Sequence, residues 1–436
     1  MSVDCRCLIH FFFFFFLSTP QTQGDGGPRP KHPVKGGIGY YYLGQEKKLV
    51  RCDFNRSDFR HLHRILHRLG DLDIDACPAD LTLEQYLQEQ KIPPSMMALA
   101  EAGYANTLCS NLKNITLRGA VAVEKGWAQD GGADYAFCLP VSVLIEHLKA
   151  GFEIRTNWIV HQVEWNLNSS YPPTSLSLSL SSSPSPKSSK CRLTSACGQV
   201  IEADQVILAL PITVLRDNDI KFSPPLPVER VEAAGRIVME PSMKIIMRFS
   251  RPFWPVDFQG VICGDCVIPE FWVKEITSDA LARSEFVVTC FTTSNFTRRL
   301  TSLPVKERDR QILAQFDEIF GASSSSKSTT PTSSASSTPA TDAFINSMYM
   351  DWSCEPFIRG GYSSPSPELH RPGHDRLLLA TPLANRLFFA GEYTRLGFST
   401  MNAATDSGLL AANHVLKSRN IPYDCPVDRV KIKPKL

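Results

Sequence analysis

One pattern near the C-terminus constrains the fold most: an apolar run that ends on a glycine and a carboxylate. Residues 387–390 read Leu-Phe-Phe-Ala, and Gly391 and Glu392 follow directly. A short run of this kind predicts a buried strand. Glu392 would then lie at the carboxyl end of that strand, where open α/β sheets bind their ligands. The glycine and glutamate alone are also compatible with an ordinary strand and helix joined by a glycine turn.

A helix is predicted to begin near residues 400–402. Small side chains recur along it, at Ala403, Ala404, Ser407, Gly408, Ala411 and Ala412. Such residues would let the helix lie close against a sheet. The free N–H groups and positive dipole end of its first turn suit an anionic or electron-accepting ligand.

Residues 386–412 as a whole resemble the C-terminal FAD motif of the flavin-containing amine oxidases, a family of polyamine oxidases, monoamine oxidases and lysine-specific histone demethylases. That motif reads approximately Phe-Ala-Gly-Glu-x-Thr, then a loop, then Thr-Val-x-Gly-Ala and Ser-Gly. The resemblance implies that Gly391 and Glu392 contact the phosphate and ribityl part of FAD. It places Thr400 and Met401 at the isoalloxazine ring.

Three further stretches resemble the same family in the same order. Residues 203–227 include Pro211 after an apolar run and resemble the crossover into the substrate domain. Residues 242–254 resemble the strand that carries the lysine near the flavin. Trp352 with residues 357–363 resembles a segment at the active site. The match adds Pro211 and Trp352 to the residues expected to bind the cofactor.

Lys244 is the first candidate catalytic residue. Strand alternation places it on the face opposite to Ile245, Met247 and Phe249, so it does not belong to the apolar face. In the family this lysine holds a water near flavin N5 and assists reoxidation by dioxygen. The alternative is a solvated surface lysine.

Tyr362 is the second candidate catalytic residue. It matches an aromatic residue of the cage that flanks the substrate, where a π face attracts a cationic amine; the alternative is an ordinary core tyrosine. Gly361 stands where the animal monoamine oxidases attach flavin through a cysteine, so the resemblance implies non-covalent FAD. Thr400 stands where those enzymes have the second aromatic residue of the cage. In this respect the pocket of this chain resembles the sites of the histone demethylases and of some polyamine oxidases more closely.

The resemblance implies oxidation of a primary or secondary amine, with polyamines favoured, to an imine. Dioxygen would be the acceptor, and hydrogen peroxide would be released. Family members open with a glycine-rich loop that holds the pyrophosphate, whereas here Gly37 and Gly39 are followed by three tyrosines and no third glycine. We therefore expect an N-terminally truncated member. The alternative is a pseudoenzyme that does not bind FAD and acts as a binding module.

The predicted fold class is α+β: an incomplete glutathione-reductase-like FAD/NAD(P)-binding domain with a substrate domain of mixed sheet and helices. The predicted division is a leader (1–37), substrate-domain parts (38–152 and 216–351), a hairpin and strand of the FAD domain (153–215), a C-terminal FAD-binding part (352–418) and a tail (419–436). Two serine-rich stretches, at residues 169–190 and 322–339, are predicted to be disordered inserts.

Hydrophobic periodicity predicts the local elements. The expected helices are residues 59–69, 81–90 with Thr82 as N-cap, 141–149 closed by Gly151, and 305–320. The expected strands are a hairpin within residues 40–53 and residues 153–158, 160–165, 199–204, 205–210 and 344–350. The apolar run 205–210 is expected to be buried on both faces.

Charge and cysteine content narrow the choice of partners. Lys plus Arg number 46 against 44 Asp plus Glu, a net charge of +2, so we expect no nucleic acid as partner, only a small amine and dioxygen. The apolar run 8–17 is too short to span a bilayer. It is either a signal-peptide core, which implies secretion, or a leader without function in a cytoplasmic protein.

Cys263 and Cys266 form a lone C-x-x-C motif. Such a motif is a redox or zinc half-site or simply a loop, and we assign no metal.

Overall fold

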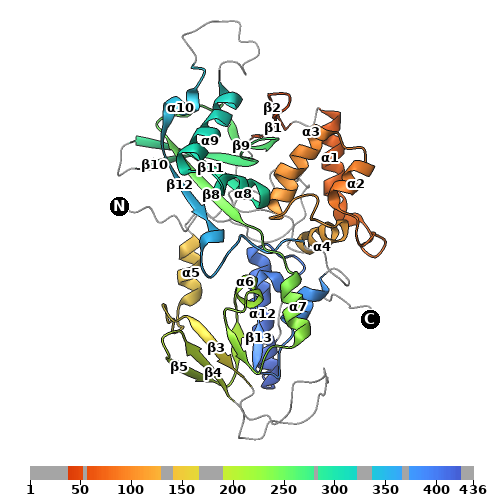
Figure 1. The fold of residues 1–436 in the computed structure, drawn as a ribbon, viewed down its shortest axis with the longest axis vertical. Coiled ribbons are helices and arrows are strands. Elements are labelled where there is room, and N and C mark those ends of the chain that lie inside the picture. The colour runs from red at the N-terminus through yellow and green to blue at the C-terminus, as the bar shows by residue number, and fades with distance from the viewer. Residues whose placement is uncertain are drawn as a thin grey trace, which may run out of the picture.

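The computed structural model describes residues 38–52, 56–128, 141–165, 190–278, 283–321, 336–365 and 373–423. The predicted leader lies outside the described residues, as do most of the two serine-rich inserts and the end of the tail. Figure 1 shows two parts stacked along the long axis of the molecule. The upper part contains the described residues within 38–128 and 242–351, and the lower part contains those within 160–236 and 374–418.

A seven-stranded sheet is the centre of the upper part. Its strands are β1 (Ile38–Leu43), β2 (Lys48–Arg51), β8 (Ser242–Phe249), β9 (Phe258–Gly264), β10 (Glu270–Ser278), β11 (Arg283–Thr293) and β12 (Phe344–Asp351). Their order across the sheet is β12-β8-β11-β10-β9-β1-β2. β1 pairs in parallel with β9, and the other neighbours are antiparallel, so the sheet is mixed, as predicted for the substrate domain.

Helix α9 (Val305–Phe320) covers one face of this sheet (Figure 1). Ile312 and Phe316 of α9 belong to the same buried cluster as Met243 and Ile245 of β8. Because side chains alternate between the two faces of a strand, Lys244 lies on the face away from α9. The other helices of the upper part are α1 (Ser57–His67), α2 (Leu83–Glu89), α3 (Pro94–Ala100), a π-helical turn (Glu101–Ala105), α4 (Leu117–Trp127), α8 (Ser294–Thr301) and α10 (Pro339–Ala343).

The lower part contains two small sheets. One has the order β5-β4-β3-β7, and the other is a parallel pair of β6 and β13. The strands are β3 (Val160–Glu164), β4 (Cys191–Ser195), β5 (Val200–Ala203), β6 (Val206–Leu208), β7 (Lys221–Ser223) and β13 (Leu387–Phe389). The helices are α6 (Ile212–Arg216), α7 (Val228–Arg236), α11 (His374–Ala380) and α12 (Met401–Ser418), and α5 (Val141–Lys149) precedes β3 in the chain.

Most of the predicted elements are confirmed. Thr82 caps α2 through a capping box with Gln85, in which each residue satisfies a backbone N–H of the other. Gly151 follows α5 with φ +85°, the left-handed conformation that glycine adopts most readily. α9 spans the predicted residues 305–320, and β1 and β2 form the predicted hairpin.

Two predictions about the strands are wrong. Residues 153–158 form no strand, because most of their side chains are exposed and Asn157 has φ +57°, which interrupts an extended chain. β6 is not buried on both faces: Ile207 is 43% exposed. Among the described residues β6 pairs only with β13, so one side of the strand remains open.

Within the described residues, no helix is long and apolar enough to cross a membrane. The domain boundaries stay a prediction.

Candidate active site

Lys244 lies in the middle of a row of side chains that crosses the upper sheet. In register, Lys244 of β8 stands opposite Phe291 of β11 on one side and Met350 of β12 on the other. Phe291 in turn stands opposite Glu270 of β10. Because residues directly opposite in a sheet point to the same face, these four side chains project together, away from α9. We call them the Lys244 row.

The environment of Lys244 is buried and aromatic. Its side chain is 7% exposed, which excludes the solvated surface lysine. Its Nζ lies 5.5 Å from the centre of the Trp272 ring and 5.7 Å from that of Phe291. Burial lowers the pKa of Lys244 to about 8, and the nearby Glu270 carboxyl opposes this shift. The amine therefore loses its proton far more readily than an exposed lysine.

Glu270 was not predicted from the sequence. It is 7% exposed, and burial raises its pKa to about 8, against the attraction of Lys244. Its Oε2 makes no hydrogen bond of ordinary length among the described residues, but the neighbouring Asn106 side chain interacts with the carboxyl and, like Lys244, opposes the rise of its pKa. The sequence signal was present but weak: a single carboxylate opens a strand whose next three residues are apolar or aromatic.

Tyr362 lies beside this row on a segment that pairs with the entry to β8. Gly361 N donates to Glu240 O at 2.9 Å, and the Tyr362 hydroxyl donates to the Thr107 carbonyl. Burial raises the pKa of Tyr362 well above its ordinary value, and the charge of Glu270 contributes to this rise. The phenol and the Glu270 carboxyl therefore belong to one electrostatic environment.

Pro211 and Gly391 follow neighbouring parallel strands. β6 and β13 end side by side, with Ala390 N donating to Leu208 O at 3.0 Å, so Pro211 and Gly391 lie at the same edge. Gly391 has φ +149°, and a Cβ added there would lie 2.4 Å from the Tyr393 ring. Only glycine fits this close approach of backbone to ring.

Glu392 cross-links three segments of the chain. Its carboxylate accepts from Ser363 N at 3.0 Å, Ser363 Oγ at 2.7 Å and Ser399 N at 2.8 Å. The buried Arg376 of α11 donates to the same Ser363 Oγ at 2.7 Å, and its guanidinium lies 3.5 Å from the centre of the Phe398 ring. This network joins the segment of Tyr362 to the start of α12, and neither Arg376 nor Ser363 was predicted.

Thr400 and Met401 form the N-terminus of α12. Thr400 Oγ1 accepts from Ala403 N at 3.0 Å, which makes Thr400 the N-cap, and Met401 is the first helical residue. Both are half-buried. Trp352 directly follows β12, two residues after the Met350 of the Lys244 row, and its carbonyl accepts from Gly360 N at 3.3 Å.

The predicted site residues therefore come from two places that one segment connects. Lys244 and Trp352 belong to the upper sheet or its end, whereas Pro211, Gly391, Glu392, Thr400 and Met401 belong to the lower part. The segment that carries Tyr362 reaches both, through Glu240 on one side and Glu392 on the other. This segment thus links the two groups of predicted residues, and their roles stay a prediction.

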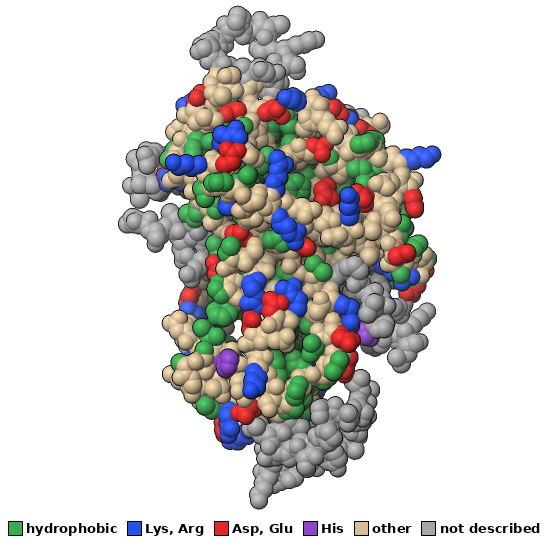
Figure 2. Space-filling view, viewed as in Figure 1, with side chains coloured by type: hydrophobic (Ala, Val, Ile, Leu, Met, Phe, Trp, Pro, Cys, Tyr) green, Lys and Arg blue, Asp and Glu red, His purple; other side chains and the backbone are tan. Residues whose placement is uncertain are grey.

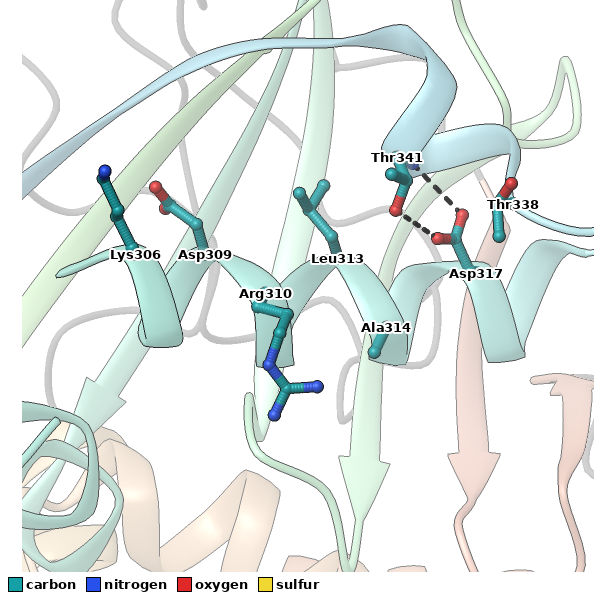
Figure 3. A pocket seen from close by; sticks show the side chains of 8 residues that line it. All are labelled: Lys306, Asp309, Arg310, Leu313, Ala314, Asp317, Thr338 and Thr341. Atoms are coloured by element: carbon teal, nitrogen blue, oxygen red, sulfur yellow. Dashed lines mark hydrogen bonds between the residues drawn. The ribbon is translucent and has the colours of Figure 1, made fainter. Parts of the chain in front are cut away.

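A surface pocket elsewhere does not belong to this site. Figure 3 shows it along α9 and the start of α10, with Arg310, Asp317 and Thr341 among its lining residues. Asp317 accepts from Thr341 N at 3.2 Å and so helps to fix the start of α10. Because α9 covers the face of the sheet opposite to Lys244, this pocket lies on the other side of the sheet. Among the described residues that line it, none is a predicted site residue.

Neither the charged surface nor the cysteines indicate a second binding site among the described residues. On the face shown in Figure 2, basic and acidic side chains are interspersed. Cys263 lies in β9 and not in a loop, and its turn partner Cys266 is half-buried; both thiols are free. The described residues contain no group of three His, Cys, Asp or Glu side chains arranged to hold a metal ion.

Comparison with known sequences gives related proteins of two kinds. Histone demethylase-like protein A of Aspergillus fumigatus is 25% identical over 370 residues, which cover 82% of this chain and 31% of that protein. Polyamine oxidase 3 of Oryza sativa subsp. japonica is 27% identical over 225 residues, covering 51% of this chain and 41% of that protein. The human peroxisomal N(1)-acetyl-spermine/spermidine oxidase is 26% identical over 252 residues, covering 50% and 44%. The chain thus spans less than half the length of these relatives.

Solved structures support the fold. Cyclohexylamine oxidase from Brevibacterium oxydans superposes with a TM-score of 0.64 at 17% identity, covering 88% of this chain and 81% of that chain. Putrescine oxidase bound to putrescine gives a TM-score of 0.62 at 17% identity, with the same coverage. The predicted fold class, α+β with a glutathione-reductase-like part and a substrate domain of mixed sheet and helices, is confirmed. That the FAD/NAD(P)-binding domain is incomplete stays a prediction.

A family model described as flavin containing amine oxidoreductase matches residues 83–416. This range contains every predicted catalytic and cofactor-binding residue. It also covers well over half of the chain, so the protein belongs to the flavin-containing amine oxidoreductase family.

Proposed function

We propose that this chain oxidises a primary or secondary amine, with polyamines favoured, to an imine. FAD would be bound without a covalent link, dioxygen would be the acceptor and hydrogen peroxide would be released. One observation carries the proposal: the segment of Tyr362 joins a buried lysine of low pKa on the upper sheet to the Glu392 network at the start of α12.

The residues of the lower part fit the flavin end of FAD. Glu392 Oε1 accepts one hydrogen bond among the described residues, so it retains a lone pair for a cofactor hydroxyl. The first N–H groups of α12 suit an electron-accepting ring. A Cβ at Gly361 would lie 2.6 Å from the Cβ of Ser242, so the chain has no room for a side chain there, such as a flavin-linking cysteine.

The residues that would hold the cofactor are Pro211, Gly391, Glu392, Thr400, Met401 and Trp352. When bound, FAD supplies the acceptor for a hydride from the α-carbon of the amine. The chain supplies position and electrostatics. The aromatic faces of Tyr362 and Trp272 attract and orient a cationic amine. Lys244, with a pKa near 8, is suited to hold a water by hydrogen bonding and to change protonation state near neutral pH.

The proposal is tested with the purified full chain. Its absorbance spectrum is recorded during titration with FAD and then during anaerobic addition of spermine, putrescine or butylamine. We expect bound flavin that an amine bleaches and that air restores, with peroxide formed. Flavin that stays free, or that binds but is reduced by none of these amines, would overturn the proposal and favour a pseudoenzyme that acts as a binding module.

A further inference from the structure

The loop that precedes α12 is anchored in the upper part of the molecule. Phe398 lies in this loop, is 3% exposed and belongs to the buried cluster that helices α1 to α4 share. Among the described residues, the other buried members of this cluster all come from residues 41–123. Phe398 is therefore a side chain of the lower part that packs into the core of the upper part.

The end of α4 holds the backbone of the same loop. Trp127, the last residue of α4, donates from its Nε1 to Phe398 O at 3.1 Å. The preceding residue, Gly126, lies directly against the loop, because a Cβ there would meet Gly397 N at 2.5 Å and Gly397 Cα at 2.6 Å. Only glycine permits this approach of helix to loop. We call the contact of Gly126 and Trp127 with residues 396–398 the α4 clamp.

The next residue of the loop belongs to the Glu392 network. Ser399 N donates to Glu392 Oε2 at 2.8 Å, and Ser399 Oγ donates to Ser363 O at 2.6 Å. Ser399 has φ +67°, a left-handed conformation that a residue with a side chain adopts only at a cost. Such a residue keeps its conformation where its surroundings hold it firmly. Glu392 and Ser363 hold Ser399 itself, and the α4 clamp holds the residue before it.

One peptide group is held at both of its ends. The carbonyl oxygen of Phe398 and the N–H of Ser399 belong to the same planar, rigid unit. Trp127 binds its oxygen, and the Glu392 carboxylate binds its N–H. Because the unit is rigid, Trp127 fixes the direction in which this N–H points toward Glu392. Packing of the Phe398 ring anchors the loop but does not by itself set this orientation.

We infer that Trp127 is a positioning residue for the cofactor site, which acts through this peptide group on the Glu392 carboxylate and on the start of α12. The inference rests on the proposed function, which assigns FAD to Glu392, Thr400 and Met401. It adds a residue of the upper part that is not among the predicted site residues. Thr400, the N-cap of α12, directly follows Ser399, so a rotation of the peptide group also reaches the first turn of the helix.

The test compares Trp127→Phe with a matched variant, Trp165→Phe. Trp165 Nε1 also donates to a backbone carbonyl, that of Pro224 at 2.8 Å, and its side chain is 6% exposed. Each substitution keeps an aromatic ring and removes one hydrogen bond, so both should lower the stability of the fold to a similar extent. The affinity of the full chain for FAD is measured by flavin fluorescence. Trp127→Phe should weaken it roughly three- to tenfold, the range for one neutral hydrogen bond, and Trp165→Phe by less than about twofold.

Amide hydrogen exchange of the cofactor-free chain gives a readout that does not depend on FAD. In a peptide that covers residues 396–404, exchange should be roughly three- to tenfold faster in Trp127→Phe than in the wild type, and unchanged in Trp165→Phe. Equal loss of FAD affinity in both variants would overturn the inference, because it would reflect lost stability alone. Weaker FAD binding without faster exchange in this peptide would overturn it too, because the effect would not pass through the loop.

The outcomes separate this inference from the proposed function. If FAD binds but no amine reduces it, only the proposed oxidation fails, and the FAD affinities of the two variants still decide the role of Trp127. A wild-type chain that binds no FAD would overturn both. FAD binding that is equal in the wild type and in a folded Trp127→Phe protein would overturn the inference alone.

Should Trp127→Phe not fold, Gly126→Ala takes its place, with Gly70→Ala as control. The new Cβ at Gly126 would push Gly397 away, whereas a Cβ at Gly70 would lie 3.5 Å from the Cβ of Glu124, an ordinary contact with α4. We expect weaker FAD binding and faster exchange of residues 396–404 in Gly126→Ala only. Wild-type affinity for FAD in Gly126→Ala would overturn the inference.

Discussion

At the scale of single residues, Lys244 is expected to act on the oxidative half of the reaction. Lys244→Met keeps the bulk of the side chain in its aromatic environment and removes the amine. We expect reoxidation of the reduced flavin by dioxygen to slow by at least about tenfold, while anaerobic reduction by amine changes by only a few-fold. Stopped-flow absorbance separates the two steps. Lys274→Met, an exposed position on β10, is the control; equal slowing of both steps would contradict this role.

Glu270 gives a prediction about stability as a function of pH. Its folded pKa, raised by burial to about 8, exceeds the ordinary value of 4.5. The unfolded chain therefore releases this proton earlier, and the contribution of Glu270 to stability falls as pH rises from 4.5 through 8. Glu270→Gln should accordingly raise Tm relative to the wild type at pH 9 by about 2–4 °C, and by less at pH 4.5. Calorimetry at both pH values checks this, and a larger gain at pH 4.5 would refute the sign.

At the scale of secondary-structure elements, the N-terminus of α12 links helix stability to the cofactor. Thr400→Ala removes the cap of Ala403 N and should cost about 1 kcal/mol of unfolding free energy. Because the same end of the helix is expected to face the flavin, FAD affinity should fall as well. Thr405→Ala, exposed in the same helix, is the control and should change neither quantity by much. Urea unfolding measures the first effect, and titration with FAD measures the second. A loss of stability with unchanged affinity for FAD would show that the N-terminus of α12 does not belong to the cofactor site.

Elements with local determinants were predictable from the sequence. The cap of Thr82, the turn after α5, the full extent of α9 and the buried strand β13 all follow from short-range patterns. The strand expected at residues 153–158 failed because alternation says nothing about whether a partner strand exists. Burial of β6 on both faces failed for the same reason, since burial is a property of the layers around a strand.

The residues of the candidate site also fall into two groups: those with a recognisable local sequence, and those whose environment depends on contacts between distant segments. Lys244, Tyr362 and Glu392 stand in segments with a distinctive local sequence, so the resemblance could name them as candidates. Glu270 and Arg376 have no such context; their importance comes from register and burial, which arise when distant segments meet. A single charged residue in apolar surroundings is a sequence signal that would have pointed to Glu270, whereas Arg376 directly follows His374 and Asp375 and has no such signal.

At the scale of the whole molecule, the residues proposed to hold FAD come from both the upper and the lower part, so FAD should stabilise the two parts together. A ligand that binds only the folded state at about 100 times its Kd adds about 2.7 kcal/mol to the unfolding free energy. Gly391→Ala should abolish this gain, because the new Cβ would lie 2.4 Å from the Tyr393 ring at the edge where Pro211 and Gly391 meet. Gly235→Ala is the matched control, since its Cβ would meet nothing within 4 Å and a helical alanine is favourable. Thermal unfolding with and without FAD should show one transition that shifts upward in the wild type and in Gly235→Ala and does not shift in Gly391→Ala. A shift confined to one of two separate transitions would instead mean that one part alone holds the cofactor. It would also mean that the segment of Tyr362 does not couple the unfolding of the upper part to that of the lower part.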